Sequence, residues 1–478
     1  MNFISFSFAV FFILFVCLYH ISAKSKKHSL IFQQILILCA SFVFYAFADF
    51  HFIPFLLYII AISYFAGIFT KSRLSLALFL IADLVPLLFF KYTPQEWHKQ
   101  WIFPLGLSFF TFQSISYIAD CYSKKIPAEQ NPLIVALYIS FFPTISSGPI
   151  QRAPFLLPQL KTVHRFDYDN ASDGMKLFAW GMFKKLCIAD KIALYVDFVY
   201  GNAGEQHGFA LLLAAILYSF QIYCDFSGYS DMAIGLTRYL GFDAGKNFDH
   251  PYLAQSIGDF WRRWHISLST WLRDYVYIPL GGSRVSIPRI YLNLIITFLV
   301  SGIWHGAGWT FIIWGLLHGI YQCAGRATKT VQGKVRLPAI IRIVFTFCLV
   351  TFAWIFFRAE DMQKVSEIIN GIAHIPQDIM EFCNLKESIG LTEAVRTEFA
   401  LYDDACGGFN GMLRLFILLA GFCLLELKTT KISGLTFIKK KNFFFRWILY
   451  TCFIILFILI SILEGQFGLS SNFIYNQF

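Results

Sequence analysis

The chain has 478 residues, of which 57% are hydrophobic and only 14% are charged. A soluble protein keeps about 25% charged residues, so the composition excludes a soluble enzyme and indicates a polytopic membrane protein. The net charge of +10 does not indicate a nucleic-acid-binding protein, because the basic residues lie in short loops between apolar runs, where charge orients membrane spans.

About twelve apolar runs are long enough to cross a bilayer, so the sequence predicts an all-α fold with about 11–12 transmembrane helices. The first run has neither a basic leader nor a small-residue cleavage site, and we interpret it as a retained span rather than a signal peptide. The predicted spans are 3–20, 30–48, 52–70, 74–91, 104–120, 132–147, 208–224, 288–304, 308–324, 338–357, 410–427 and 443–463.

Basic residues in the short loops predict the orientation of these spans. Placing the basic loops in the cytoplasm puts the N-terminus outside, and counting back from Lys439–Lys441 puts the C-terminus outside as well. The acidic loop 359–409 is then external. If that loop faces an oxidising space, Cys383 and Cys406 form a disulfide, and two free thiols are the alternative.

Two regions, 148–206 and 225–287, do not fit a simple series of spans. The first holds Pro149, Pro154 and Pro158, which a continuous helix does not accommodate. Both regions indicate short helices that lie in the cytoplasmic interface or enter the bilayer and return. Irregular backbone at that depth must be buried in protein or line a wet cavity, so we predict a central funnel.

Arginines are concentrated among tryptophans and tyrosines in the segment DFWRRWHISLSTWLRDYVYIPLGGSR. Charge is costly in lipid, so this segment indicates a ligand-binding function. We therefore assign Arg262, Arg263, Trp261 and Trp264 to donor or substrate binding, while an interfacial belt remains an alternative. His265 follows Trp264, and it either contacts an anionic donor, helps a partner to dock, or makes only structural hydrogen bonds.

His305 follows Trp304 in the motif SGIWHGAGW, between two long apolar runs. The glycines of this motif leave space for a substrate and allow the helix to break. A neutral imidazole in an apolar cavity is a suitable general base, and structural hydrogen bonding is the alternative. We include Trp304 among the substrate-binding residues, and for His318, on the next predicted span, we favour a helix-packing role.

Asp225 and Asp231 lie in the run QIYCDFSGYSDMAIG. Two carboxylates at a membrane boundary could bind a cation or the hydroxyls of an acceptor, and pairing with the nearby arginines is the alternative. The cysteines have neither zinc nor iron–sulfur spacing, and the chain has no Walker loop, dinucleotide fingerprint or nucleophile elbow. We therefore predict no bound metal or cofactor.

Four blocks of the sequence together closely resemble the membrane-bound O-acyltransferases. The blocks are SGPIQR (147–152), QIYCDFSGYSDMAIG (221–235), DFWRRWHISLSTWLRDYVYIPLGG (259–282) and GIWHGAGWTFIIWGLLHG (302–319). The resemblance is to the bacterial branch that O-acetylates alginate, peptidoglycan and other exported polysaccharides, a relative of which transfers D-alanine during teichoic acid modification. It implies a multi-helix fold around a funnel, with His305 matching the catalytic histidine and His265 a second polar position.

The resemblance further implies one membrane-embedded domain over 1–478. Its parts are N-terminal helices (1–147), a catalytic core with interfacial helices (148–324) and C-terminal helices with the external loop (325–478). It implies acetyl-CoA as the cytoplasmic donor, in a protein of the cell inner membrane with both termini in the periplasm. We then expect Arg262, Arg263, Lys184 and Lys185 on the cytoplasmic face, where the anionic CoA arrives.

The tail NFIYNQF resembles the tyrosine-containing C-terminal end of this branch, but it has Asn476 where an aromatic residue is usual. Tyr475 is therefore a candidate acyl acceptor whose proton His305 removes, and an interfacial anchor is the alternative.

We expect a membrane O-acetyltransferase that works within membrane lipid and uses acetyl-CoA. Its expected partner is a periplasmic SGNH- or esterase-like O-acetyltransferase that delivers the acetyl group to an exported polysaccharide, either peptidoglycan or an alginate-like polymer. No nucleic acid partner is expected. The alternative function is that of a transporter or channel subunit for a polysaccharide or lipid-linked sugar, because such a protein would share the funnel and the interfacial arginines.

Overall fold

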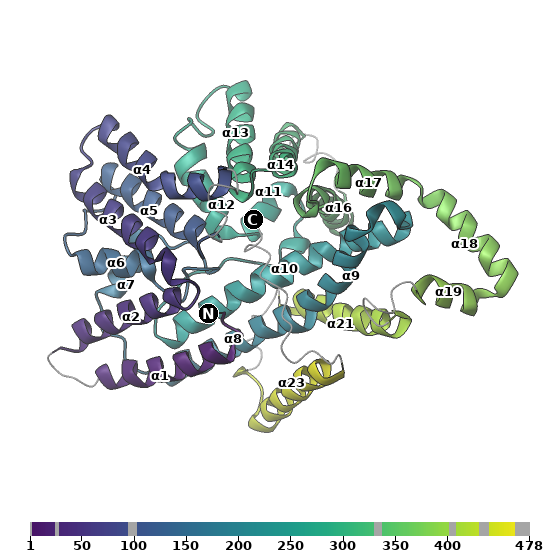
Figure 1. Cartoon of the computed structure of the whole chain (residues 1–478), viewed down its shortest axis with the longest axis horizontal. Coiled ribbons are helices and arrows are strands. Elements are labelled where there is room, and N and C mark those ends of the chain that lie inside the picture. The colour runs from purple at the N-terminus through teal and green to yellow at the C-terminus, as the bar shows by residue number, and fades with distance from the viewer. Residues whose placement is uncertain are drawn as a thin grey trace. The chain divides into compact units, whose positions relative to one another are not determined.

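The computed structural model describes residues 2–23, 28–93, 103–328, 337–400, 408–429 and 439–463, and the regular elements in these residues are all helical (Figure 1). The helices form two compact units. Unit 1 consists of Met1–Gly181, Tyr229–Asp249 and Trp264–Asn293, and unit 2 consists of Met182–Gly228, His250–Arg263 and Leu294–Phe478.

Seven helical segments of the described chain are long and apolar enough to cross a membrane. Twenty helical residues cover about 30 Å, which matches the hydrocarbon core of a bilayer. The expectation of an all-α polytopic membrane protein is therefore confirmed. The seven segments are Ser29–Ala46 (α2), Phe50–Phe69 (η1 and α3), Arg73–Tyr92 (α4), Gly208–Tyr239 (α10), Ile287–His305 (α13), Ala339–Arg358 (α16) and Gly408–Thr429 (α21). The helices α1 (Phe6–Ser22) and α23 (Phe443–Leu463) are also apolar.

In unit 1, α3 packs against α4, α5 (Leu107–Tyr122) and α6 (Pro132–Ser140), and α2 packs against α1 and α6. A buried polar chain joins three of these helices: Ser114 on α5 donates to the Asp83 carboxylate on α4 at 2.7 Å, and its hydroxyl lies 2.6 Å from that of Ser63 on α3. Such bonds offset the desolvation of polar groups within the packed helices. The short helix α7 (Ala153–Leu160) packs on α5 and α6.

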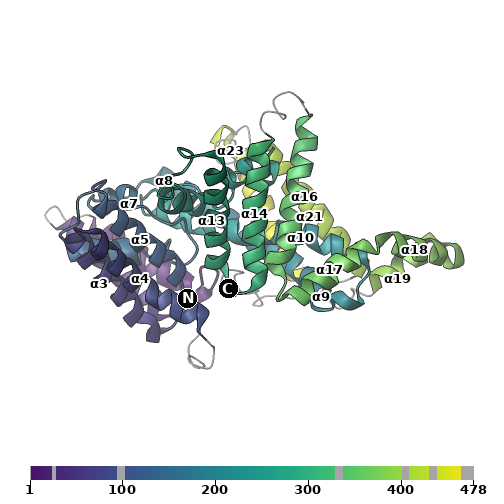
Figure 2. The same ribbon diagram turned by 90° about the horizontal axis from the view of Figure 1, so that it is seen from above.

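In unit 2, the short helix α11 (Ile257–Arg263) packs against α14 (Trp309–Ala327) and α16. Both views show α14 beside α16, in green, and α16 also contacts α17 (Met362–Ala373) (Figures 1 and 2). A π-helix, η3 (Lys184–Ala189), contacts α9 (Asp190–Gly201), α21 and α23.

Three predicted boundaries were wrong. The span predicted at 132–147 ends at Ser140, because Pro143 disfavours helical backbone in the residue before it. The span predicted at 208–224 continues to Tyr239, since the carboxylate at position 225 is buried and paired rather than placed at a membrane boundary. The region 359–409 is not a simple loop, because three helices occupy much of it: α17, α18 (Ile375–Ile389) and α19 (Leu391–Ala400).

Candidate active site

His305 is the last residue of α13, and three residues, Gly306 to Gly308, connect it to α14. The predicted break of the helix at this position is therefore confirmed. The imidazole is 3% exposed. Its ring centroid lies 4.6 Å from that of Trp304, 5.0 Å from that of Trp314 and 5.1 Å from that of Phe357, with all three rings steeply inclined to it. The imidazole thus lies among aromatic rings contributed by α13, α14 and α16.

Two of the glycines near His305, Gly302 and Gly306, do not leave space for a substrate, contrary to our expectation. A Cβ atom on Gly302 would overlap the backbone oxygen of Phe311 and lie 3.4 Å from the Cα of Gly315. A Cβ on Gly306 would overlap the ring of Phe311. These glycines instead allow α13 and α14 to pack with their backbones in close contact, as small residues do between membrane helices.

His318 lies on α14 one helical turn after Trp314 and is fully buried. The indole Nε1 of Trp261 donates a hydrogen bond to His318 Nδ1 at 3.2 Å. Because an indole N–H only donates, Nδ1 must be the accepting nitrogen, and the proton of the neutral imidazole is on Nε2. The predicted packing role of His318 agrees with this bond between α11 and α14, but the assigned tautomer also makes the ring a hydrogen-bond donor.

His265, in unit 1, is fully buried and has left-handed backbone with φ +42°. Its Nδ1 lies 3.2 Å from Asn247 Oδ1, which also accepts bonds from the backbone N–H and the hydroxyl of Ser267. The amide nitrogen of Asn247 donates to Ser230 Oγ at 3.0 Å. Since these bonds fix Asn247 Oδ1 as an acceptor, His265 donates through Nδ1. Sequence reasoning missed Asn247, because no motif distinguishes it.

Burial lowers the pKa of His265 from 6.5 to about 3, so the folded protein keeps this ring neutral. The unfolded chain gains a proton here below about pH 6.5. The free energy of unfolding is therefore not reduced by this histidine above that pH. As the pH falls toward 3, protonation of His265 in the unfolded chain lowers it by up to about 1.4 kcal/mol per pH unit. We expect the thermal unfolding midpoint of the purified protein to fall more steeply between about pH 7 and pH 5 than that of His265→Asn, whose side chain tolerates left-handed backbone and does not titrate. Parallel curves would contradict this expectation.

The residues assigned to donor binding differ in their exposure. Arg262 is 73% exposed and Arg263 is 32% exposed, and both pair with Asp259, at 3.5 and 3.1 Å. Trp261 is buried against His318. Trp264, in unit 1, is 1% exposed and packs edge-to-face on Phe248 with ring centroids 5.1 Å apart. The two arginines keep contact with solvent, whereas both tryptophans belong to the protein interior.

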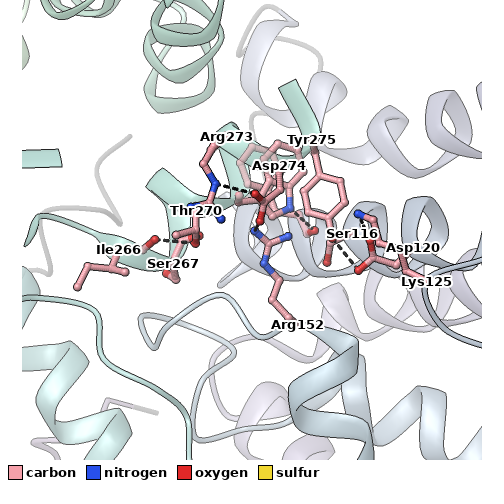
Figure 3. A network of polar contacts seen from close by, with 12 residues as sticks. Ser116, Asp120, Lys125, Arg152, Ile266, Ser267, Thr270, Arg273, Asp274 and Tyr275 are labelled. Atoms are coloured by element: carbon pink, nitrogen blue, oxygen red, sulfur yellow. Dashed lines mark hydrogen bonds and ion pairs between the residues drawn. The ribbon is translucent and has the colours of Figure 1, made fainter. Parts of the chain in front are cut away.

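The rest of the arginine-rich segment forms a polar network in unit 1 (Figure 3). The guanidinium of Arg152 lies 4.6 Å from the ring centroid of Tyr275 and 3.6 Å from the Asp274 carboxylate. The hydroxyl of Tyr275 donates to Asp120 at 2.7 Å, and Lys125 pairs with the same carboxylate at 3.0 Å. Burial raises the pKa of Tyr275, so its hydroxyl stays protonated and keeps this bond. These contacts join Arg152 of the block SGPIQR to Asp274 and Tyr275 of the arginine-rich segment within unit 1.

Residues 11–359 match the membrane-bound O-acyltransferase family. The chain belongs to this family. It is 37% identical over 409 residues to a peptidoglycan O-acetyltransferase of Helicobacter pylori, covering 74% of this chain and 78% of that protein. It is 39% identical over 375 residues to a probable alginate O-acetylase AlgI of Azotobacter vinelandii, covering 73% of each, and 32% identical over 307 residues to a teichoic acid D-alanyltransferase of Bacillus subtilis, covering 59% of this chain and 76% of that protein.

Because it belongs to this family, the protein is an enzyme, a membrane-bound O-acyltransferase. The family match favours an acyltransferase over the alternative function of a transporter. His305, Trp314, His318 and Phe357 all lie within the matched residues. Tyr475 and Cys406 lie outside the described residues, so the acceptor role and the disulfide stay predictions; Cys383 is exposed on α18.

Lys184 and Lys185, which we expected on the cytoplasmic face where an anionic CoA arrives, are buried and paired within the protein. They are 3% and 1% exposed, at the start of the π-helix η3. Lys185 pairs with Asp190 at 2.8 Å and with Asp225 at 2.7 Å. Lys184 donates to Ser227 Oγ at 2.8 Å. Asp225 therefore pairs with a lysine, and not with one of the nearby arginines that we gave as the alternative to ligand binding.

Asp231 is half-buried, six residues after Asp225 on α10. Six residues correspond to about 240° around the helix axis, so the two carboxylates do not share a helix face. Joint binding of one ligand by this pair therefore has no support from the helix geometry. Trp304, the other residue assigned to substrate binding, is 6% exposed beside His305.

A second, partly buried group contains residues that sequence reasoning missed. The Glu426 carboxylate on α21 accepts a bond from the Tyr223 hydroxyl at 2.9 Å and lies 2.9 Å from His250 Nδ1. His250 has φ +48°, a backbone conformation that is rare outside glycine. Glu426 lies beyond the residues that match the family. In the sequence, Glu426 stands alone near the end of an apolar run. Nothing there indicates that it pairs with Tyr223 and His250, about 200 residues earlier.

Among the described residues, His207, Asp378 and Glu381 place ligand atoms within 4.8 Å of one another. All three side chains contact solvent. Asp378 already accepts a bond from the backbone N–H of Gly208 at 2.6 Å, at the start of α10. Helix capping accounts for this carboxylate, and the group includes none of the residues assigned to acyl transfer.

Proposed function

We propose that this acyltransferase passes an acetyl group from cytoplasmic acetyl-CoA across the cell inner membrane for O-acetylation of an exported polysaccharide, either peptidoglycan or an alginate-like polymer. The activities of two relatives, as their names give them, support an acetyl group and a polysaccharide acceptor: they are a peptidoglycan O-acetyltransferase and a probable alginate O-acetylase. The position of His305, a buried imidazole at the broken end of a membrane helix, is the observation that carries the proposal.

In the proposed reaction, His305 is the general base. The imidazole takes the proton of an acceptor hydroxyl while the hydroxyl oxygen bonds to the carbonyl carbon of the thioester, whose oxygen becomes negatively charged. The carbonyl then re-forms, the carbon–sulfur bond breaks, and the CoA thiolate takes the proton from His305. The products are an acetyl ester and CoA thiol, so the imidazole returns to its neutral state without a net gain or loss of protons.

Only the acetyl group has to cross the membrane in this scheme. The basic loops favour a topology with both termini in the periplasm, and exposed Arg262 is available to an anionic donor. We propose that a periplasmic SGNH- or esterase-like transferase completes delivery to the sugar hydroxyls, and that Tyr475 either carries the acetyl group between the two proteins or anchors the tail in the interface.

His305→Ala is expected to lower acetyl transfer from acetyl-CoA by about 10²–10⁴-fold, because the variant lacks the proposed base. The measurement is acetyl release from radiolabelled acetyl-CoA by purified protein in vesicles, together with ester-linked acetate on the cell polysaccharide. His20→Ala is a matched control, since the imidazole of His20, on α1, also lies among aromatic rings. Its ring centroid is 5.1 Å from the ring centroid of Phe166. Full activity of His305→Ala at normal membrane levels would refute the proposal.

A further inference from the structure

Two hydrogen-bond donors on α14 have no partner among the residues that the structure describes. They are the indole Nε1 of Trp314 and the Nε2 of His318, and both side chains are fully buried. The bond from Trp261 to His318 Nδ1 assigns the proton of His318 to Nε2, so both nitrogens are donors. A buried donor without an acceptor costs about 1–3 kcal/mol, and proteins therefore rarely keep one without a reason.

The two donors share one face of α14, because Trp314 and His318 are four residues apart. Their ring centroids are 5.0 Å apart, and the centroid of Trp314 is also 5.0 Å from that of His305. On α13, Ser301 precedes His305 by one turn and carries a third buried polar atom without a described partner, its hydroxyl oxygen. Unsatisfied polar atoms thus lie on the ring that packs against the proposed base and one helical turn away from that contact on each of the two helices.

We propose that Trp314 Nε1–H and His318 Nε2–H bind the acyl carbonyl oxygen while it carries negative charge. This inference rests on the proposed function, in which His305 is the base. A hydroxyl bonded to His305 lies roughly 3 Å from its nitrogen and roughly 3 Å from the carbonyl carbon that it attacks, so the charged oxygen forms near the rings that surround the imidazole. Donors that are already in place stabilise such an oxygen strongly when water is excluded.

Solvent reaches neither nitrogen. The acyl group therefore displaces one of the aromatic rings packed around His305 when it binds, and the dry surroundings strengthen the bonds that it then accepts. The neutral state of His318 matters for the same reason: with Nδ1 engaged by Trp261, the ring has one orientation and one free proton to donate.

Trp314→Phe keeps an aromatic ring and removes only the indole N–H and its second ring. We expect kcat for acetyl transfer to fall about 100-fold while KM for acetyl-CoA changes by less than about threefold, because the lost bond forms in the transition state. Trp354→Phe is the matched control. Trp354 is 1% exposed and stacks on Trp314 with ring centroids 5.9 Å apart, so Trp314 lies between it and His305. The kcat of Trp354→Phe should therefore stay within about threefold of the wild-type value.

Two amide variants of His318 distinguish the roles of its two ring nitrogens. His318→Asn offers an acceptor where Nδ1 accepts from Trp261 and has no donor at the position of Nε2, whereas His318→Gln extends an amide N–H toward that position. We expect His318→Gln to retain at least about tenfold more kcat than His318→Asn. Thermal unfolding of both proteins reports any loss of folded enzyme, and rates are expressed per folded molecule.

The outcomes distinguish this inference from the proposed function. Wild-type kcat in Trp314→Phe and His318→Asn, with His305→Ala inactive, would overturn the inference alone and leave the two donors as structural groups. Activity in His305→Ala would overturn the proposed function itself. Equal losses in Trp314→Phe and Trp354→Phe would also overturn the inference, because the effect would then follow from packing rather than from the donor.

Discussion

Lys185→Met is expected to destabilise the folded protein by about 3–5 kcal/mol, because it removes one partner from a buried group of charges. Lys185 lies between two carboxylates, at 2.8 Å from Asp190 and 2.7 Å from Asp225, and these three side chains are 1%, 8% and 1% exposed. Methionine fills nearly the same volume but leaves both carboxylates buried without this cation. The measurement is the thermal unfolding midpoint of purified protein in detergent.

Lys246→Met is the matched control for this prediction. Lys246 pairs with Asp249 at the same distance of 2.7 Å, but the two side chains are 62% and 42% exposed. Exposed pairs contribute about 0–1 kcal/mol, so the control should unfold close to the wild-type temperature. The double variant Lys185→Met with Asp225→Asn removes one of the buried negative charges and should be more stable than Lys185→Met alone. If Lys185→Met and Lys246→Met have equal midpoints, the buried group does not stabilise the fold.

Apolar runs predicted the membrane helices well because length and hydropathy alone decide whether a segment can cross a bilayer. The same criterion failed where a charge is neutralised inside the protein. The prediction ended a span before Asp225, but α10 continues to Tyr239 because Lys185, forty residues earlier in the chain, pairs with that carboxylate. One sequence without a structure gives no sign of such a pairing, so the charge was taken to mark the membrane boundary.

The candidate site was predictable in part. The motif around His305 identified a histidine at a helix break, and the structure has the helix end at that residue. The hydrogen-bond partners of His265 and His318 were not predictable. Asn247 and Trp261 come from parts of the chain that meet these histidines only through folding. The role of the glycines was also misjudged, since a missing side chain admits a neighbouring helix as readily as a substrate.

Gly302→Ala is expected to destabilise the protein by about 3 kcal/mol and to reduce acetyl transfer further than the loss of folded protein explains. The added Cβ would overlap the backbone oxygen of Phe311, and no side-chain rotation relieves a clash with backbone. The helices α13 and α14 must then separate. Because His305 follows Gly302 by about one turn and contacts Trp314 on the other helix, the separation moves the imidazole away from that ring.

Gly325→Ala is the control, because it makes the same change on α14 at a position where nothing lies within 4 Å of the added Cβ. In open space, alanine favours a helix by about 0.5–1 kcal/mol over glycine, so this variant should be as stable as the wild type or slightly more stable. Gly315→Ala repeats the test from the facing helix, since its Cβ would overlap the backbone oxygen of Phe298. If Gly302→Ala and Gly315→Ala are as stable and active as Gly325→Ala, the helices are not in backbone contact here. If stability falls but the rate per folded molecule is unchanged, the close packing supports the membrane fold without positioning His305.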